Sequence, residues 1–304
     1  MKIIERTDKS LNWLGRWMEN NGKYSGWGGS SLQFKFTGSS LSIEVDVHNS
    51  GGISVMIDDY SDNWTHKLTP THNGLNTITI SSELENKEHT AFFRFWSTNY
   101  KNKRSGTDYI KVNNILIDDN AVINKWSGDV KLGYFGDSWA SADNDCLRFI
   151  GLDSVEIHSI SDPGFTSSNG LNMYPYVAGT IPIKDISFDA VVIGYGINDA
   201  NRRFLSSNYI FKKNIIKLID NIRANDPIVK IFLLQSPRNY SSKKDASKYG
   251  SVLEDISKKR RDCIYISSKD TENQLGWSVD GVHLDTKGKH IYGKWLGEQL
   301  SYYL

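Results

Sequence analysis

The chain has 304 residues, 38% hydrophobic and 12% aromatic, and its 36 Lys and Arg are balanced by 35 Asp and Glu, giving a formal net charge of +1. This length buries a sizeable core and suggests about two domains. The balance of charge offers no electrostatic footprint for nucleic acid or for an anionic membrane surface. Only two cysteines occur, Cys146 and Cys263, so we expect neither a disulfide framework nor a cysteine-rich zinc site, and no metal site is implied.

The first residues, MKIIERTDKSLNWLG, lack the apolar core of a secretory signal, and no window approaches about 18 apolar residues. We therefore expect no membrane span and a cytoplasmic location by default. Export without a signal peptide, or assembly on a surface, is the alternative.

From Ser31 to about Trp126, short segments alternate apolar and polar residues with the period of two that is typical of half-buried antiparallel strands. These segments are SLQFKFTG, SLSIEVDVH, GISVMIDD, LNTITIS, HTAFFRFWS and YIKVNNILID. One face of a strand would carry Leu41, Ile43, Val45 and Val47. We predict an all-β, jelly-roll-like sandwich over residues 1–127.

From Val130 onward, short apolar segments alternate with helical stretches. The expected strands are VKLGYF, VEIHSI, FDAVVIGYG, IVKIFLLQ and CIYI. The clearest helix is NYIFKKNIIKLIDNIRAN, in which Phe211, Ile215, Leu218, Ile219 and Ile222 share one face. Because FDAVVIG is apolar almost throughout, it is typical of a strand buried on both faces of a parallel sheet. We predict a three-layer α/β/α domain over residues 128–304, with its reactive groups at the carboxyl ends of the strands.

Three stretches whose side chains are suited to catalysis fall at that edge of the predicted sheet. GDS places Ser138 after the first strand, GYGINDA places Asn198 after the central strand, and DGVHLD places Asp280 and His283 before the last helix. Each has a plain structural alternative: a turn for Ser138 and Asp280, and a helix cap for Asn198 or Asp199. Their occurrence together, in this order, favours a catalytic interpretation.

A serine hydroxyl needs an adjacent base to become a nucleophile at neutral pH, and histidine is suited to that role. A carboxylate that accepts the other imidazole N–H holds the ring in one tautomer, so Asp280 would orient His283. The tetrahedral intermediate needs donors aimed at its oxyanion, which the Ser138 N–H and the Asn198 amide would supply.

With these motifs the chain resembles the SGNH/GDSL hydrolase family over about residues 130–304. The matching stretches are FGDS (Gly136, Asp137 and Ser138), GIND (Gly196, Asn198 and Asp199) and DGVH (Asp280 and His283). The family's remaining glycine matches SDPGFT more loosely, at Gly164, where a turn after Pro163 is the alternative. The resemblance implies a Ser138–His283–Asp280 triad and an oxyanion hole formed by Ser138, Gly164 and Asn198.

A β module ahead of such a domain is similar to carbohydrate esterase family 2. GRW and YSGWGGSSLQFKFTGSSLSIEV resemble that module by rhythm more than by individual residues. The resemblance implies removal of acetyl groups from a polysaccharide, with the β module as a carbohydrate-binding unit. It requires no cofactor.

The predicted function is therefore a serine esterase that removes O-acetyl groups from a carbohydrate. The same triad would serve a capsule or O-antigen O-acetyltransferase with acetyl-CoA as donor, and the resemblance covers both. A catalytically silent carbohydrate-binding protein is the third hypothesis.

Further aromatic and basic residues have two interpretations each. Trp139 either walls a pocket for a short acyl group or packs in the core, and Arg202 and Arg203 either meet an acidic substrate or begin a solvated helix. A sugar-stacking platform and a β-module core compete for the following side chains: Trp13, Trp17, Tyr24 and Trp27.

Overall fold

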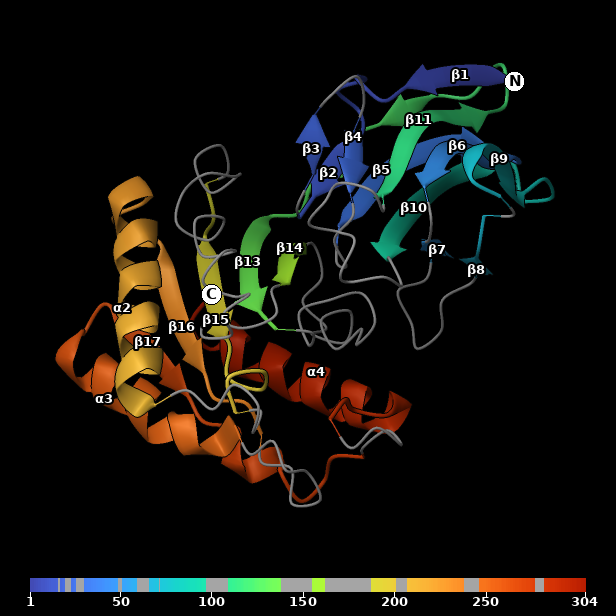
Figure 1. The fold of residues 1–304 in the computed structure, drawn as a ribbon. Helices are drawn as coiled ribbons and strands as arrows, with labels where there is room; N and C mark the ends of the chain where they lie inside the picture. The colour runs from blue at the N-terminus through green and yellow to red at the C-terminus, as the bar shows by residue number, and fades with distance from the viewer. Residues whose placement is uncertain are drawn as a thin grey trace. The chain divides into compact units, whose positions relative to one another are not determined.

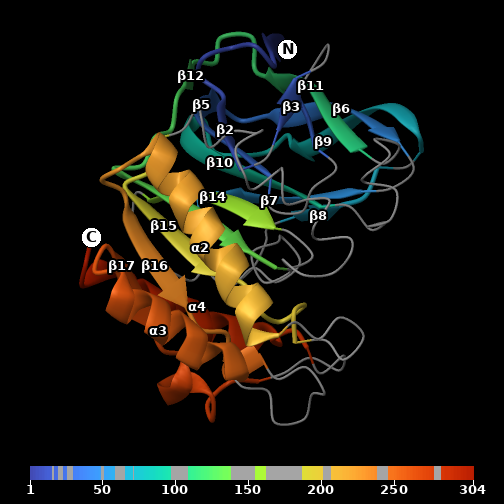
Figure 2. The ribbon, with the colours of Figure 1, turned by 60° about the vertical axis from the view of Figure 1, so that its left-hand side comes forward.

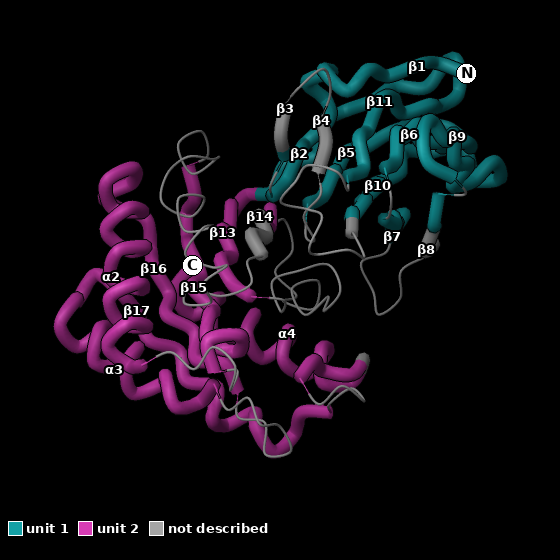
Figure 3. Tube along the Cα trace, in the orientation of Figure 1, with its two compact units in different colours: residues 1–128 teal, residues 129–304 magenta. Residues whose placement is uncertain are grey.

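The structure is a computed structural model, and the residues it describes form two compact units, Met1–Gly128 and Asp129–Leu304 (Figure 3). It describes all of the chain except residues 16, 20–22, 26–29, 49–50, 59–65, 71, 97–108, 138–154, 162–186, 201–206, 238–245 and 277–281. Each unit has its own hydrophobic core. Within the described parts, no helix is both long enough and apolar enough to cross a bilayer.

The first unit contains two antiparallel sheets, each six-stranded among the described residues (Figure 1). One sheet has the order β3-β4-β11-β6-β9, with β1 also on β11: β1 (Lys2–Glu5), β3 (Met18–Glu19), β4 (Lys23–Ser25), β6 (Leu41–His48), β9 (Gly74–Ser81) and β11 (Tyr109–Ile117). The other has the order β12-β5-β10-β7-β8, with β2 also on β5: β2 (Asn12–Leu14), β5 (Ser31–Gly38), β7 (Gly52–Ile57), β8 (His66–Leu68), β10 (Lys87–Trp96) and β12 (Ile123–Asn124). The predicted antiparallel strands from Ser31 onward are confirmed.

The two sheets share one apolar core. On β6, the four residues that the period-two pattern predicts are buried in this core: Leu41, Ile43, Val45 and Val47. Ser42 between them is buried as well. The other sheet contributes Phe34 of β5 and Phe93 of β10, whose rings stack with centroids 5.8 Å apart. On β6, alternation of polarity therefore indicates the face that lies against the core. The jelly-roll connectivity stays a prediction.

Trp13 and Trp17 pack against this core. The Trp17 ring contacts Trp13 edge-on at 4.6 Å and Phe95 at 5.1 Å between centroids. Its indole Nε1 donates to the carbonyl oxygens of Leu14 at 3.0 Å and Ser31 at 3.1 Å. This packing favours the core interpretation for Trp13 and Trp17. Trp27 and the side chain of Tyr24 lie outside the described residues.

The second unit is built on a parallel sheet, as predicted, with the strand order β14-β13-β15-β16-β17 (Figure 1). The strands are β13 (Val130–Gly136), β14 (Val155–Ser161), β15 (Ala190–Gly194), β16 (Lys230–Leu234) and β17 (Cys263–Ile266). The helices are α2 (Asn208–Asn225), η5 (Ala246–Tyr249), α3 (Gly250–Lys259), η6 (Lys269–Thr271) and α4 (Thr286–Ser301). Helices α2 and α3 cover one face of the sheet and α4 covers the other (Figures 1 and 2).

Helix α2 has the predicted bounds and the predicted apolar face. Its buried hydrophobic residues are Phe211, Ile215, Leu218, Ile219 and Ile222. The helix begins where the Ser207 side chain accepts the N–H of Ile210 at 3.2 Å. All of β15 is buried, as expected of a strand covered on both faces.

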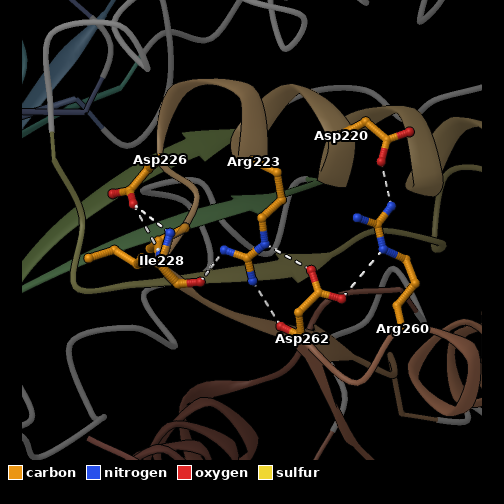
Figure 4. A network of polar contacts seen from close by, with 7 residues as sticks. Asp220, Arg223, Asp226, Ile228, Arg260 and Asp262 are labelled. Atoms are coloured by element: carbon orange, nitrogen blue, oxygen red, sulfur yellow. Dashed lines mark hydrogen bonds and ion pairs between the residues drawn. The ribbon is translucent and has the colours of Figure 1, made fainter.

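Ion pairs and hydrogen bonds connect α2 to the residues that precede β16 and β17 (Figure 4). The Arg223 guanidinium donates to a carboxylate oxygen of Asp262 at 2.8 Å, to the Asp262 carbonyl oxygen at 2.9 Å, and to the Val229 carbonyl oxygen. Arg260 extends the network to Asp220 and, at 3.6 Å, to Asp262. At the amino ends of these strands, the polar side chains therefore serve to hold the helix to the sheet.

Candidate active site

The point at which the strand order reverses lies between β13 and β15: the chain adds β14 on one side of β13 and then continues with β15 on the other side. β13 is the first strand of the sheet along the chain; its neighbours are β14 on one side and β15 on the other. Gly136, the last residue of β13, pairs with Gly194, the last residue of β15. In open α/β sheets, ligands bind at the carboxyl ends of the strands where the order reverses. The topology therefore places the candidate active site beyond Gly136 and Gly194.

Asp137 follows β13 directly, and its relative exposure is 0%. Its carboxylate Oδ2 accepts the backbone N–H of Gly196 at 3.2 Å and that of Asn198 at 3.1 Å. These residues belong to FGDS and GIND, the first two stretches singled out in the sequence. The structure thus brings two of the three stretches into direct contact across 61 positions of the chain.

The GIND stretch is a tight turn closed by a hydrogen bond of 2.8 Å from the Ala200 N–H to the Gly196 carbonyl oxygen. Gly196 has a φ of +137°, which side chains with a Cβ rarely adopt. Within the turn Asp199 is buried, whereas Asn198 is only half-buried. Asn198 is therefore the polar residue of this turn that remains partly accessible.

Burial first, and the nearby charge of Asp199 second, raise the pKa of Asp137 to about 7. The N–H groups of Asn198, Gly196 and Ile197 act in the opposite direction, because they stabilise the carboxylate. A carboxyl group that titrates near neutrality thus stands one residue before the expected nucleophile.

Tyr249, at the end of η5, supports the turn from the helical side. Its hydroxyl donates to the Asp199 carbonyl oxygen at 3.1 Å, and its ring stacks on Phe211 of α2 with centroids 4.0 Å apart. A Cβ on Gly196 would lie 3.3 Å from the Tyr249 ring. The sequence does not point to Tyr249, because a single aromatic residue ahead of a short helix carries no distinctive signal.

His283 is half-buried and lies just ahead of α4. The Asp285 side chain caps that helix by accepting the Gly288 N–H at 2.7 Å, and the Asp285 N–H donates to the Gly276 carbonyl oxygen at 3.1 Å. A Cβ on Gly288 would collide with the Gly276 carbonyl oxygen, so the close approach of the two segments needs glycine. The backbone that follows His283 is therefore held in place at the start of α4.

Most of the predicted site residues lie outside the described residues: Ser138, Trp139, Gly164, Asp280, Arg202 and Arg203. Asn198 and His283 are described. Neither Asn198 nor Asp199 caps α2, because Ser207 does so. In the part of the chain that the structure describes, no group of three or more His, Cys, Asp or Glu side chains is arranged to hold a metal ion.

No protein-family model matches the chain, and no curated protein matches it in sequence. Solved structures do resemble it. A family two carbohydrate esterase from Cellvibrio japonicus superposes with a TM-score of 0.76, covering 99% of this chain and 97% of that one at 16% identity. The chain has the fold of the family two carbohydrate esterases.

Two further structures share this fold. The acetyl xylan esterase Est2A from Butyrivibrio proteoclasticus has a TM-score of 0.71 at 12% identity, covering 100% of this chain and 99% of that one. The salicylyl-acyltransferase SsfX3 from a tetracycline biosynthetic pathway has a TM-score of 0.70 at 12% identity, covering 99% and 97%. The SGNH/GDSL hydrolase fold with a family two architecture, expected from the motifs, is thereby confirmed.

Proposed function

We propose that the chain is a serine O-acyl hydrolase that removes acetyl groups from a carbohydrate. The observation that carries this proposal is the contact of Asp137 with the N–H groups of Gly196 and Asn198. It holds the GIND turn beside the end of β13, one residue before Ser138. A nucleophile and an oxyanion donor must be neighbours for acyl transfer, and this contact supports that arrangement. The name of an acetyl xylan esterase among the similar structures supports acetyl as the acyl group.

In the proposed mechanism the Ser138 hydroxyl attacks the acetyl carbonyl carbon while His283 takes its proton. Asp280 holds the imidazole in the required tautomer. The developing oxyanion accepts hydrogen bonds from the backbone N–H groups of Ser138 and Gly164 and from the Asn198 side-chain amide. His283 then returns the proton to the departing sugar oxygen, which leaves an acetyl-serine.

Water completes the cycle. His283 removes a proton from the water as it attacks the acetyl-serine carbonyl, and the same proton returns to the Ser138 oxygen when acetic acid leaves and ionises in solvent. No cofactor takes part. Trp139 walls the acyl pocket in this proposal, so acetyl esters should turn over faster than octanoyl esters. Arg202 and Arg203 would meet an acidic group on the carbohydrate, and the first unit would bind its sugar rings.

The test is hydrolysis of 4-nitrophenyl acetate and of acetylated xylan by the purified chain, its Ser138→Ala variant and its Ser251→Ala variant. Ser251 is an exposed serine on α3 and serves as the control. Turnover that disappears in Ser138→Ala and persists in Ser251→Ala supports the proposal. Unchanged turnover in Ser138→Ala would overturn the nucleophile assignment. No turnover by the parent chain would leave the silent carbohydrate-binding protein as the better hypothesis.

Transfer of an acetyl group from acetyl-CoA to a sugar hydroxyl is the second candidate function. It is favoured by the fold shared with a salicylyl-acyltransferase. The transferase and the esterase would use the same triad. They would differ in the acceptor of the acetyl group, which is a sugar hydroxyl in the transferase and water in the esterase. Incubation with acetyl-CoA and a glycan separates the two functions, because only the transferase adds the mass of an acetyl group to the glycan.

A further inference from the structure

Carboxylates tie β13 to β15 at both ends. At the amino end, the exposed Asp189 accepts the Lys131 N–H at 2.7 Å through its side chain. At the carboxyl end, the buried Asp137 accepts the N–H groups of Gly196 and Asn198. The Asp189 carboxylate is exposed and binds one backbone N–H, whereas the Asp137 carboxylate is buried and binds two.

The buried tie is energetically expensive. A carboxylate taken out of water loses its hydration, and here the charge of Asp199 adds repulsion. The backbone N–H groups of a tight turn offset part of that loss, because they point together at the carboxylate as in an anion-binding nest. The result is a turn whose orientation is fixed by a side chain from another strand.

The functional residue of this turn is Asn198. The Asn198 N–H bonds to Asp137, and the half-buried side chain of the same residue is the proposed oxyanion donor. Together with the Ala200–Gly196 hydrogen bond that closes the turn, the bond to the Asn198 N–H restricts the direction of the Asn198 Cα–Cβ bond. A displacement of about 1 Å at a reacting group can lower a rate by about a hundredfold.

We propose that Asp137 is a positioning residue that holds the Asn198 amide at the oxyanion site by binding the backbone N–H groups of Gly196 and Asn198. This inference rests on the proposed function. Asp137 does not touch the substrate and acts through Asn198. Removing the acceptor should therefore lower kcat and leave KM nearly unchanged, since the donor acts on charge that develops in the transition state.

The experiment compares Asp137→Asn, which keeps an acceptor oxygen, with Asp137→Ala, which removes it. We expect kcat for 4-nitrophenyl acetate to fall about 10-fold in the first and about 100-fold in the second, with KM within about threefold. Asp189→Asn is the matched control, because it alters the tie at the other end of the same strands; its kcat should remain within about twofold of the parent value.

A double variant separates positioning from a general loss of structure. In the Asn198→Ala background the donor is gone, so adding Asp137→Asn should change kcat no further. If the decrease in kcat of the double variant equalled the product of the decreases in the two single variants, the proposal would be overturned. Equal kcat and KM in the parent, Asp137→Asn and Asp137→Ala would overturn it as well.

Amide hydrogen exchange tests the tie without relying on activity. In Asp137→Asn the N–H groups of Gly196 and Asn198 should exchange about 10-fold faster, while Asp189→Asn should accelerate only the Lys131 N–H. Unchanged protection at Gly196 and Asn198 would refute the tie even if the parent chain is inactive and Asp137→Ala fails to fold. If the parent chain is inactive but exchange at Gly196 and Asn198 is faster in Asp137→Asn than in the parent, the tie is confirmed. The proposed function is then rejected, and with it the positioning role in catalysis.

Discussion

The Tyr249 hydroxyl donates a hydrogen bond of 3.1 Å to the Asp199 carbonyl oxygen, although 50 positions of the chain separate the two residues. Both are buried. Through this bond, η5 supports the same turn that Asp137 holds from the sheet.

Tyr249→Phe should lower the free energy of unfolding by about 1–2 kcal/mol, because the variant loses a buried donor to a backbone carbonyl while the ring keeps its stacking on Phe211. Urea titration followed by tryptophan fluorescence measures this change. Tyr209→Phe is the control: Tyr209 is 74% exposed, and its substitution should leave the midpoint unchanged. Equal midpoints for the two variants would contradict a stabilising role for the hydroxyl.

Gly196→Ala should be more destabilising than Gly74→Ala. Both glycines have a positive φ, +137° and +96°, so both substitutions strain the backbone, at about 1–3 kcal/mol each. Only at Gly196 does the new Cβ also meet a neighbour, the Tyr249 ring at 3.3 Å, whereas nothing lies within 4 Å of the Cβ at Gly74. A larger loss of unfolding free energy in Gly196→Ala than in Gly74→Ala, measured by urea titration, would support the packing contribution, and a larger loss at Gly74 would argue against it.

Stability should depend on pH through Asp137. Its pKa is about 7 in the folded chain, compared with an ordinary value of 3.8, so between these values the folded state holds a proton that the unfolded state has released. The corresponding stability is present below about pH 4 and is lost as the pH rises through about 7, on the order of 4 kcal/mol in total. Asp137→Asn lacks this group, so the stability difference, parent minus variant, should decrease from pH 4 to pH 8. A difference that is constant with pH would show that Asp137 titrates normally.

Arg223→Lys should destabilise the second unit by about 1 kcal/mol. A lysine ammonium cannot reach the Asp262 carboxylate, the Asp262 carbonyl and the Val229 carbonyl with the planar fork of arginine. The exposed neighbour Arg261, changed to lysine, is the control and should not alter the melting temperature. Because the network lies at the amino edge of the sheet, kcat of the folded variant should equal that of the parent; a fall in kcat would link this edge to the site.

The apolar pattern of the sequence was sufficient for elements with clear boundaries. The bounds of β5, β17 and α2 are as predicted, since each has a clear apolar pattern between turn or capping residues. Strand β1 was not predicted. Only Ile4 of its four residues is buried, and its neighbour Ile3 is exposed, so alternation is too short to detect. Helix α3 was also missed: it is short and begins at a glycine, where helix propensity is poor.

The site was predictable as a set of motifs but not as a set of contacts. GDS and GIND indicate their chemistry by residue type, and the sheet topology explains why they meet. The burial of Asp137 does not follow from its neighbours in sequence, because Gly and Ser on either side read as an exposed turn. Its partners lie 59 and 61 positions away, and such pairings follow from the folded sheet alone.

The bond between Asp285 and Gly276 has a consequence for how such a protein can change. The capped start of α4 lies directly against the segment that ends at Gly276. A side chain at position 288 would collide with the Gly276 carbonyl oxygen, whereas Lys287 beside it is exposed. Natural variation, or a laboratory library, should therefore retain glycine at position 288 while it freely changes position 287.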